Sequence, residues 1–143
     1  MTTTINASTS SGLVNTADTS GIIKVQSNGV TTNALAWVNF NGTSGASPVI
    51  RASYNVSSVT RNTTGYYTIV FTNALTDANY SIVGATSTNG SNPSGGLQIN
   101  SQSIAGSWAL VTPTTTQFSV GVLQYNGVAA LDPTYACIAI FGN

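Results

Sequence analysis

Three runs of sequence alternate apolar and polar residues: ALAWVNFNGT (34–43), VIRASYNVSSVT (49–60) and GYYTIVFTNALTDANYSIVG (65–84). Successive side chains of a strand point to opposite faces, so a period of two is typical of strands, whereas a helix repeats about every 3.6 residues. Turn-forming segments such as Asn-Gly-Thr and Thr-Asp-Ala-Asn separate the strand-like segments. The stretch from residue 34 to residue 84 therefore predicts antiparallel strands, and it contains no catalytic motif.

The alternation also predicts which side chains share a face of each strand. The first run places Ala36, Val38 and Phe40 on one face, and the opposite face carries Leu35, Trp37 and Asn39. The second run predicts one face with Ile50, Ala52, Tyr54 and Val56, and an opposite face with Arg51, Ser53 and Asn55.

Further strand-like segments occur along the rest of the chain. Strands are expected at Gly21–Gln26, Tyr54–Thr60, Tyr66–Thr72, Tyr80–Thr86, Gln98–Asn100, Ser107–Thr112, Gln117–Tyr125 and Tyr135–Phe141. Expected turns and loops are 27–29 with a hairpin into 30–32, 41–48, 61–65, 76–79 and 87–96. The last strand has two apolar faces, so it is expected in the middle of a sheet or between two sheets.

These segments predict an all-β domain over residues 21–143, an antiparallel β-sandwich of about eight to ten short strands. Residues 1–20 are rich in Thr, Ser and Asn and are predicted to form an arm, either flexible or docked on a neighbouring subunit. The start of the chain lacks the basic and apolar parts of a signal peptide, which predicts a product that stays in the cell or leaves by a route other than secretion, such as cell lysis.

Charge is scarce: only 4% of residues are charged and the net charge is zero, against roughly a quarter of charged residues in an ordinary domain. The charged residues are Lys24, Arg51, Arg61, Asp18, Asp77 and Asp132. Three scattered cations disfavour nucleic acid and anionic membranes as partners. A neutral surface of Ser, Thr, Asn and Gly instead favours a subunit of a homo-oligomer.

Catalytic residues are not apparent. The chain has no histidine and a single cysteine, Cys137, which excludes Ser–His–Asp catalysis and zinc sites and leaves no cofactor or metal to predict. A pair of carboxylates remains a remote alternative, but each Asp lies in a turn segment where its side chain is expected to hydrogen-bond the local backbone. Cys137 is expected to be a buried, inert thiol. The sequence predicts that the protein is not an enzyme.

Candidate binding residues are aromatic and amide side chains, because neutral sugars stack on aromatic rings beside polar groups. The aromatic residues Trp37, Tyr66, Trp108 and Tyr125 are either such platforms or core and interface residues. The candidate binding set is Trp37, Asn89, Ser91, Asn92, Trp108 and Tyr125. Candidate subunit contacts are Arg51, expected either on a solvated face or in an interface, and Ile5, Leu13 and Val14 of the arm.

The motifs WVNFNGT, IRASYNVSSVT, GYYTIVF and DANYSIVG together resemble a module of bacteriophage tail-fibre and other virion structural proteins. The resemblance covers residues 34–84 well, the final strand YACIAIF fairly and the arm weakly. It implies a homotrimeric, non-enzymatic protein located in the virion, with other virion proteins and a host surface glycan as partners.

The resemblance leaves the place in the virion open. Such modules usually end a longer fibre, whereas here only a short arm precedes the module. The alternatives are a short tail fibre or fibre tip for host attachment, a capsid decoration protein that stabilises the shell, and a piece of a longer protein.

Overall fold

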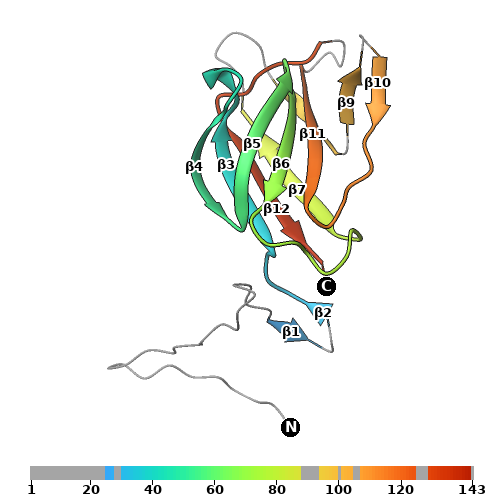
Figure 1. Ribbon diagram of the computed structural model, residues 1–143. Coiled ribbons are helices and arrows are strands. Elements are labelled where there is room, and N and C mark those ends of the chain that lie inside the picture. The colour runs from blue at the N-terminus through green and yellow to red at the C-terminus, as the bar shows by residue number, and fades with distance from the viewer. Residues whose placement is uncertain are drawn as a thin grey trace, which may run out of the picture.

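The computed structural model describes residues 25–27, 30–87, 94–99, 101–104, 107–124 and 129–142, and it shows an all-β fold with two packed four-stranded antiparallel sheets. Sheet I contains, in spatial order, β4 (Val49–Tyr54), β3 (Ala36–Asn41), β12 (Ala136–Phe141) and β7 (Ser81–Thr86). Sheet II contains β5 (Val56–Thr63), β6 (Tyr66–Phe71), β11 (Gln117–Gln124) and β8 (Ser94–Ile99). The predicted β-sandwich is confirmed (Figure 1).

Three smaller elements complete the described structure. They are the hairpin of β1 (Gln26–Ser27) and β2 (Val30–Thr31), the hairpin of β9 (Ser101–Ile104) and β10 (Ser107–Leu110), and the 3₁₀ turn η1 (Gly42–Ser44). Figure 1 shows β1 and β2 beyond the end of the sandwich where β12 finishes, and β9 and β10 beside β11. The predicted hairpin is confirmed where β1 pairs with β2, whereas residues 21–24 of its predicted first strand and the predicted arm, 1–20, lie outside the described residues.

The core lies between the sheets. The alternation of residues in β3 correctly predicted which of its side chains belong to the core. Ala36, Val38 and Phe40 are buried, while Trp37 is exposed. Leu35 is the exception, because it precedes the strand and is 2% exposed although the pattern placed it on the Trp37 face. Sheet II contributes Val59, Tyr67, Ile69, Phe71, Phe118, Val120 and Val122 to the same core.

The predicted alternation from Ile50 to Val56 is wrong, because the segment belongs to two strands in different sheets. Asn55 has a positive φ of 54° and separates β4 from β5. A bulge in β4 also shifts its register against β3, so that Ile50 pairs with the buried Phe40 while Tyr54 pairs with Trp37. Residues paired directly across strands share a face, so Ile50 and Tyr54 point to opposite sides of sheet I.

β12 lies in the middle of sheet I, hydrogen-bonded to β3 on one side and β7 on the other. The prediction for the last strand is therefore confirmed. The expectation for Cys137 is wrong, because this thiol is exposed. It lies on the outward face of β12, where no second layer covers it in the described part of the chain.

The hairpin of β5 and β6 confirms the predicted pairing, with a shorter turn than expected, because Arg61 belongs to β5 and only Thr64 and Gly65 lie between the strands. The expected 87–96 loop is partly wrong, since β8 already begins at Ser94. The sequence reasoning missed β9 altogether. Among the described residues, no helix is long and apolar enough to cross a membrane.

Candidate functional site

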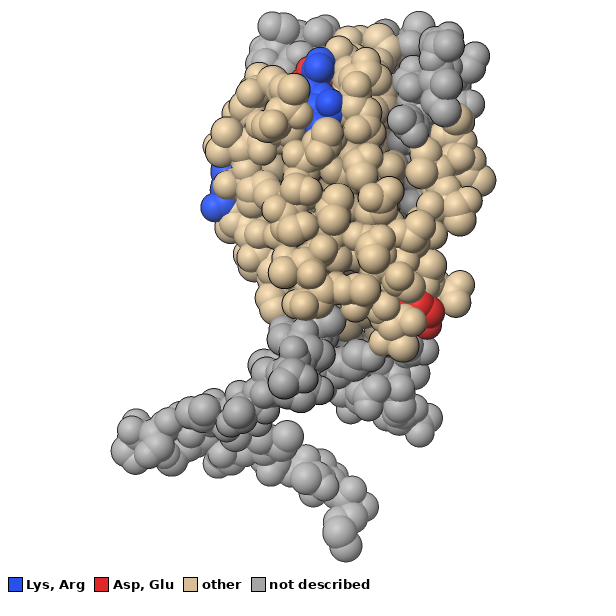
Figure 2. All heavy atoms as spheres, in the orientation of Figure 1, with Lys and Arg blue, Asp and Glu red and all other residues tan. Residues whose placement is uncertain are grey.

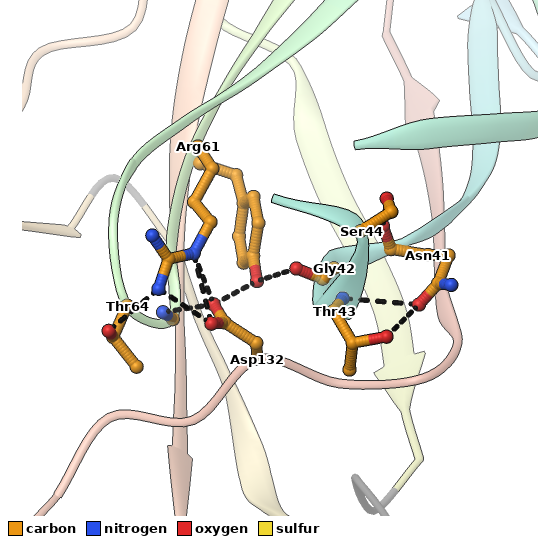
Figure 3. Close-up of polar contacts among 9 residues, drawn as sticks. Asn41, Gly42, Thr43, Ser44, Arg61, Thr64 and Asp132 are labelled. Atoms are coloured by element: carbon orange, nitrogen blue, oxygen red, sulfur yellow. Dashed lines mark hydrogen bonds and ion pairs between the residues drawn. The ribbon is translucent and has the colours of Figure 1, made fainter. Parts of the chain in front are cut away.

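Asp132 is the centre of a polar cluster at one end of the sandwich (Figure 3). Its carboxylate accepts hydrogen bonds from Arg61 Nε at 2.9 Å and Nη2 at 2.7 Å, and from the Tyr67 hydroxyl at 2.6 Å. The backbone N–H of Gly65 donates a further bond of 2.8 Å. Asp132 precedes β12, and its partners come from β5, β6 and the turn between them, so the cluster joins the segment leading into sheet I to sheet II.

The protonation states of this cluster follow from its contacts. Burial on its own would raise the pKa of Asp132, but the hydrogen bonds from Arg61, Tyr67 and Gly65 outweigh it and lower the pKa below the usual range. The hydrogen bond to Asp132 raises the pKa of Arg61. Burial, together with the hydrogen bond to the carboxylate, raises the pKa of Tyr67 far above its ordinary value. The cluster is therefore an ion pair with a neutral tyrosine over the whole physiological range.

Close packing at Gly42 fixes the Tyr67 hydroxyl in this cluster. A Cβ atom on Gly42 would collide with that hydroxyl and with Pro133, so only glycine fits there. The Asn41 side chain accepts from the Thr43 N–H at 3.1 Å and caps η1 beside the cluster (Figure 3). Protein donors occupy the acceptor sites of the carboxylate. Asp132 is therefore better suited to a structural contact between the two sheets than to the role of a general base.

The expectation of a local turn contact is thus wrong for Asp132 and confirmed for Asp77, whose carboxylate accepts from the Asn79 N–H at 2.7 Å. Asp77 follows one end of β6, whereas Asp132 contacts Gly65 at the other end. In Figure 2 the acidic groups accordingly appear at opposite ends of the molecule. The two therefore do not form a carboxylate pair, and Asp18 lies outside the described residues.

The outer face of sheet I, defined here by the outward side chains of its four strands, is a second notable surface. One row across the strands is Tyr54, Trp37, Ala139 and Val83, and the next is Ala52, Asn39, Cys137 and Ala85. Trp37 is 39% exposed and Val83 49% exposed. Between these two side chains lies an open groove of about 370 Å³ over β3, β12 and β7. The face is mostly apolar and exposed, and its groove is open to solvent.

The outer face of sheet II has a different character. Thr60, Thr68 and Ser119 form a row of hydroxyl groups across β5, β6 and β11. Thr68 Oγ1 lies 3.4 Å from Ser119 Oγ and accepts a 2.8 Å bond from the Asn62 side chain. Ser119 is only 3% exposed and β9 lies against β6 and β11, so part of this face is covered within the chain itself. The two outer faces of the sandwich are therefore not equivalent.

Arg51 lies at the margin of the outer face of sheet I. Its guanidinium carbon is 4.0 Å from the centroid of the Tyr135 ring, and its Nη2 donates to the Thr134 carbonyl at 2.8 Å. It also donates a longer bond of 3.4 Å to Asn39. A cation stacked on an aromatic ring and bonded to a carbonyl is held in place. The partner of Arg51 within the chain is thus Tyr135, a contact that the sequence did not predict.

The structure tests only part of the candidate binding set. Trp37 is exposed as a platform residue must be, whereas Tyr66 is 3% exposed and is not available for stacking. Trp108 belongs to β10, and its side chain is not described. Asn89, Ser91, Asn92, Tyr125, Ile5, Leu13 and Val14 lie outside the described residues.

The Asp132 cluster was missed by sequence reasoning, although one signal was present. Tyr67 shares the inward face of its strand with Ile69 and Phe71, and a buried tyrosine hydroxyl needs a hydrogen-bond partner. In the described part of the chain no three Asp, Glu, Cys or His side chains are grouped as metal ligands would be. No known protein family, curated protein or solved structure matches this chain significantly.

Proposed function

We propose that this chain is a non-enzymatic structural protein of a bacteriophage virion, a short tail fibre or fibre-tip module that attaches to the host surface. The observation that carries the proposal is the set of motifs in residues 34–84, which resemble those of virion modules. These residues form β3 to β7, and so they supply strands to both sheets of the sandwich.

The charge distribution supports the role of an assembled subunit. Arg61 and Asp132 neutralise each other at 2.7 Å, and Arg51 is stacked on Tyr135. A subunit with so little free charge neither repels its copies nor depends on ionic strength for its contacts. We propose a homotrimer, which is the assembly that the resemblance implies, with other virion proteins and a neutral host glycan as partners.

The test is competition for host adsorption. Host cells preincubated with the purified protein are expected to adsorb fewer phage particles, because the protein occupies their receptor, and the heat-denatured protein serves as the control. Adsorption that is unchanged at saturating protein, together with no binding of the labelled protein to cells, would contradict the attachment role.

A capsid decoration protein is the second candidate, because the resemblance of residues 34–84 extends to virion structural proteins other than tail fibres. Quantitative gel densitometry of purified virions separates the two roles. A copy number in the hundreds per particle is expected for decoration of an icosahedral shell, and a few tens of copies or fewer for tail fibres. A chain that is not found in virions at all would rule out both roles.

A further inference from the structure

The outer face of sheet I is unusual because apolar side chains are exposed where a soluble protein normally places polar ones. Trp37, Val83 and Phe141 are 39%, 49% and 36% exposed on this side of the sheet, and the exposed thiol of Cys137 lies in the row next to that of Trp37 and Val83. Each of the four strands has six residues, so the platform measures on the order of 400 Å². The largest apolar patch of a typical protein has about this size and is often functional.

The other outer face provides an internal control for this observation. On sheet II the outward Tyr66 and Ser119 are each only 3% exposed, and β9 lies against β6 and β11, so this outer face is partly covered within the chain. Both faces belong to the same chain with the same composition, so composition alone does not explain the exposed apolar residues. Their concentration on one face indicates that this face is covered in the working assembly.

The charges decide what kind of partner fits. Arg51 is the only charged residue in the four strands of sheet I, and it is held at the margin by the Tyr135 ring 4.0 Å away. A basic macromolecule would therefore find no complementary charge here, and an acidic one would find a single guanidinium at the margin. A second copy of this chain has no net charge, so it approaches this face without overall repulsion, and Arg51 at the margin is the one charge in the strands of the face.

The groove argues against a carbohydrate as the occupant. A sugar needs several hydrogen-bonding groups around its aromatic platform, and beside Trp37 the groove offers one amide side chain, that of Asn39, among Val38, Val83, Gly84, Cys137, Ile138 and Ala139. We therefore infer that the outer face of sheet I is the surface through which this chain binds further copies of itself. The inference rests on the proposed function insofar as a virion subunit works as a homo-oligomer.

The test introduces a charge into the centre of the face. Ala139→Arg and Val83→Arg place a guanidinium beside Trp37, and Thr60→Arg makes the same change on the outer face of sheet II as a matched control. The wild type and Thr60→Arg are expected to be oligomers by mass measurement in solution. Both sheet I variants are expected to be monomers that keep the β-sheet circular dichroism spectrum and the melting transition.

Cys137 supplies a second readout because it is the single cysteine of the chain. At concentrations where the wild type is an oligomer, the reaction of Cys137 with a maleimide is expected to be about tenfold slower, or more, than after dilution to the monomer, since access to the thiol limits the reaction. This measurement uses the unmutated face, so it keeps the inference testable even where an arginine variant fails to fold.

Three results would overturn the inference. The first is that both arginine variants retain the wild-type mass. The second is that Cys137 of the oligomer reacts as fast as that of a monomer. The third is that the wild type is a monomer whose Trp37 fluorescence responds to neutral oligosaccharides. The proposed function is tested by separate measurements. A monomer that blocks phage adsorption keeps the proposed function and refutes this inference, whereas an oligomer that associates through sheet I but is absent from virions does the reverse.

Discussion

Asp132 is the residue that joins the segment before β12 to the strands of sheet II. It is 19% exposed, and its carboxylate holds Arg61, Tyr67 and the Gly65 N–H together. Exposed ion pairs contribute little, but removing one partner of a half-buried, hydrogen-bonded pair leaves the other groups without their acceptor. The stabilisation therefore comes less from the attraction of the two charges than from the cost of leaving three donors unsatisfied.

Replacing Asp132 with Asn is expected to destabilise the fold by about 3 kcal/mol at pH 7 and to lower Tm by roughly 10 °C. The amide has the same shape but removes the charge and puts a donor among donors. Asp77→Asn is the matched control, because its turn contact to the Asn79 N–H needs only a carbonyl acceptor. Thermal unfolding followed by circular dichroism measures both variants, and equal Tm losses would contradict the role given to Asp132.

The comparison of the wild type with Asp132→Asn also predicts how the contribution of Asp132 to stability depends on pH. The folded-state pKa of Asp132 is lowered, so its stabilisation is complete above the unfolded value of about 3.9 and is lost as the pH falls through the folded value. The difference in unfolding free energy between the wild type and Asp132→Asn is expected to be constant from pH 7 to about pH 5 and to shrink below about pH 4. Urea titrations across this range would reveal a contrary trend.

At the scale of elements, Asn55 decides how the sheets are connected. It adopts a φ of 54° between β4 and β5, and its side chain hydrogen-bonds the segment before β3 and the segment after β6. Its amide donates to the carbonyl groups of Leu35 and Asn73 at 3.2 Å each, and its oxygen accepts from the Asn73 N–H at 2.8 Å. One residue thus moves the chain from sheet I to sheet II and anchors the start of the segment after β6.

Two substitutions separate the backbone from the side-chain contribution at this position. Asn55→Gly loses the three hydrogen bonds but tolerates the positive φ, and we expect a cost of about 2 kcal/mol. Asn55→Ala loses the same bonds and adds backbone strain, so it is expected to cost about 1 kcal/mol more. Chemical denaturation of both variants measures the difference, and an alanine variant as stable as the glycine variant would show that no strain is stored there.

At the scale of the whole molecule, the described structure has two unlike outer faces and few free charges. Figure 2 shows charged groups only at its margins and ends in that view. The Arg61–Asp132 pair is satisfied internally, and Arg51 is stacked on Tyr135. Association through such a surface depends on apolar burial, which excluded salts strengthen and simple screening leaves unchanged.

The oligomer is accordingly expected to dissociate at nearly the same protein concentration in 0.05 M and about 0.5 M sodium chloride. In ammonium sulfate of equal ionic strength its dissociation constant is expected to fall several-fold, because the sulfate ion favours burial of apolar surface. Analytical ultracentrifugation across these buffers measures both constants. A large loss of association in sodium chloride would indicate ionic contacts between subunits instead.

The local pattern of residues was enough to predict the all-β class, most strands and the inward face of β3. This was possible because alternation is a property of neighbouring residues, and burial of Ala36, Val38 and Phe40 follows from it. The same logic placed the final strand in the interior of a sheet, and β12 lies there between β3 and β7. The oligomeric and virion assignments stay predictions.

What the pattern could not predict depends on residues far apart in sequence. Asp132 meets Arg61 across 71 positions and Tyr67 across 65, so its local turn signal was misleading. The break at Asn55 and the bulge in β4 are set by pairing with β3, and no alternation rule contains them. Whether the second apolar face of β12 is buried or exposed was likewise decided by how many layers the domain has. Because the described sandwich has two, the face of β12 that carries Cys137 points outward.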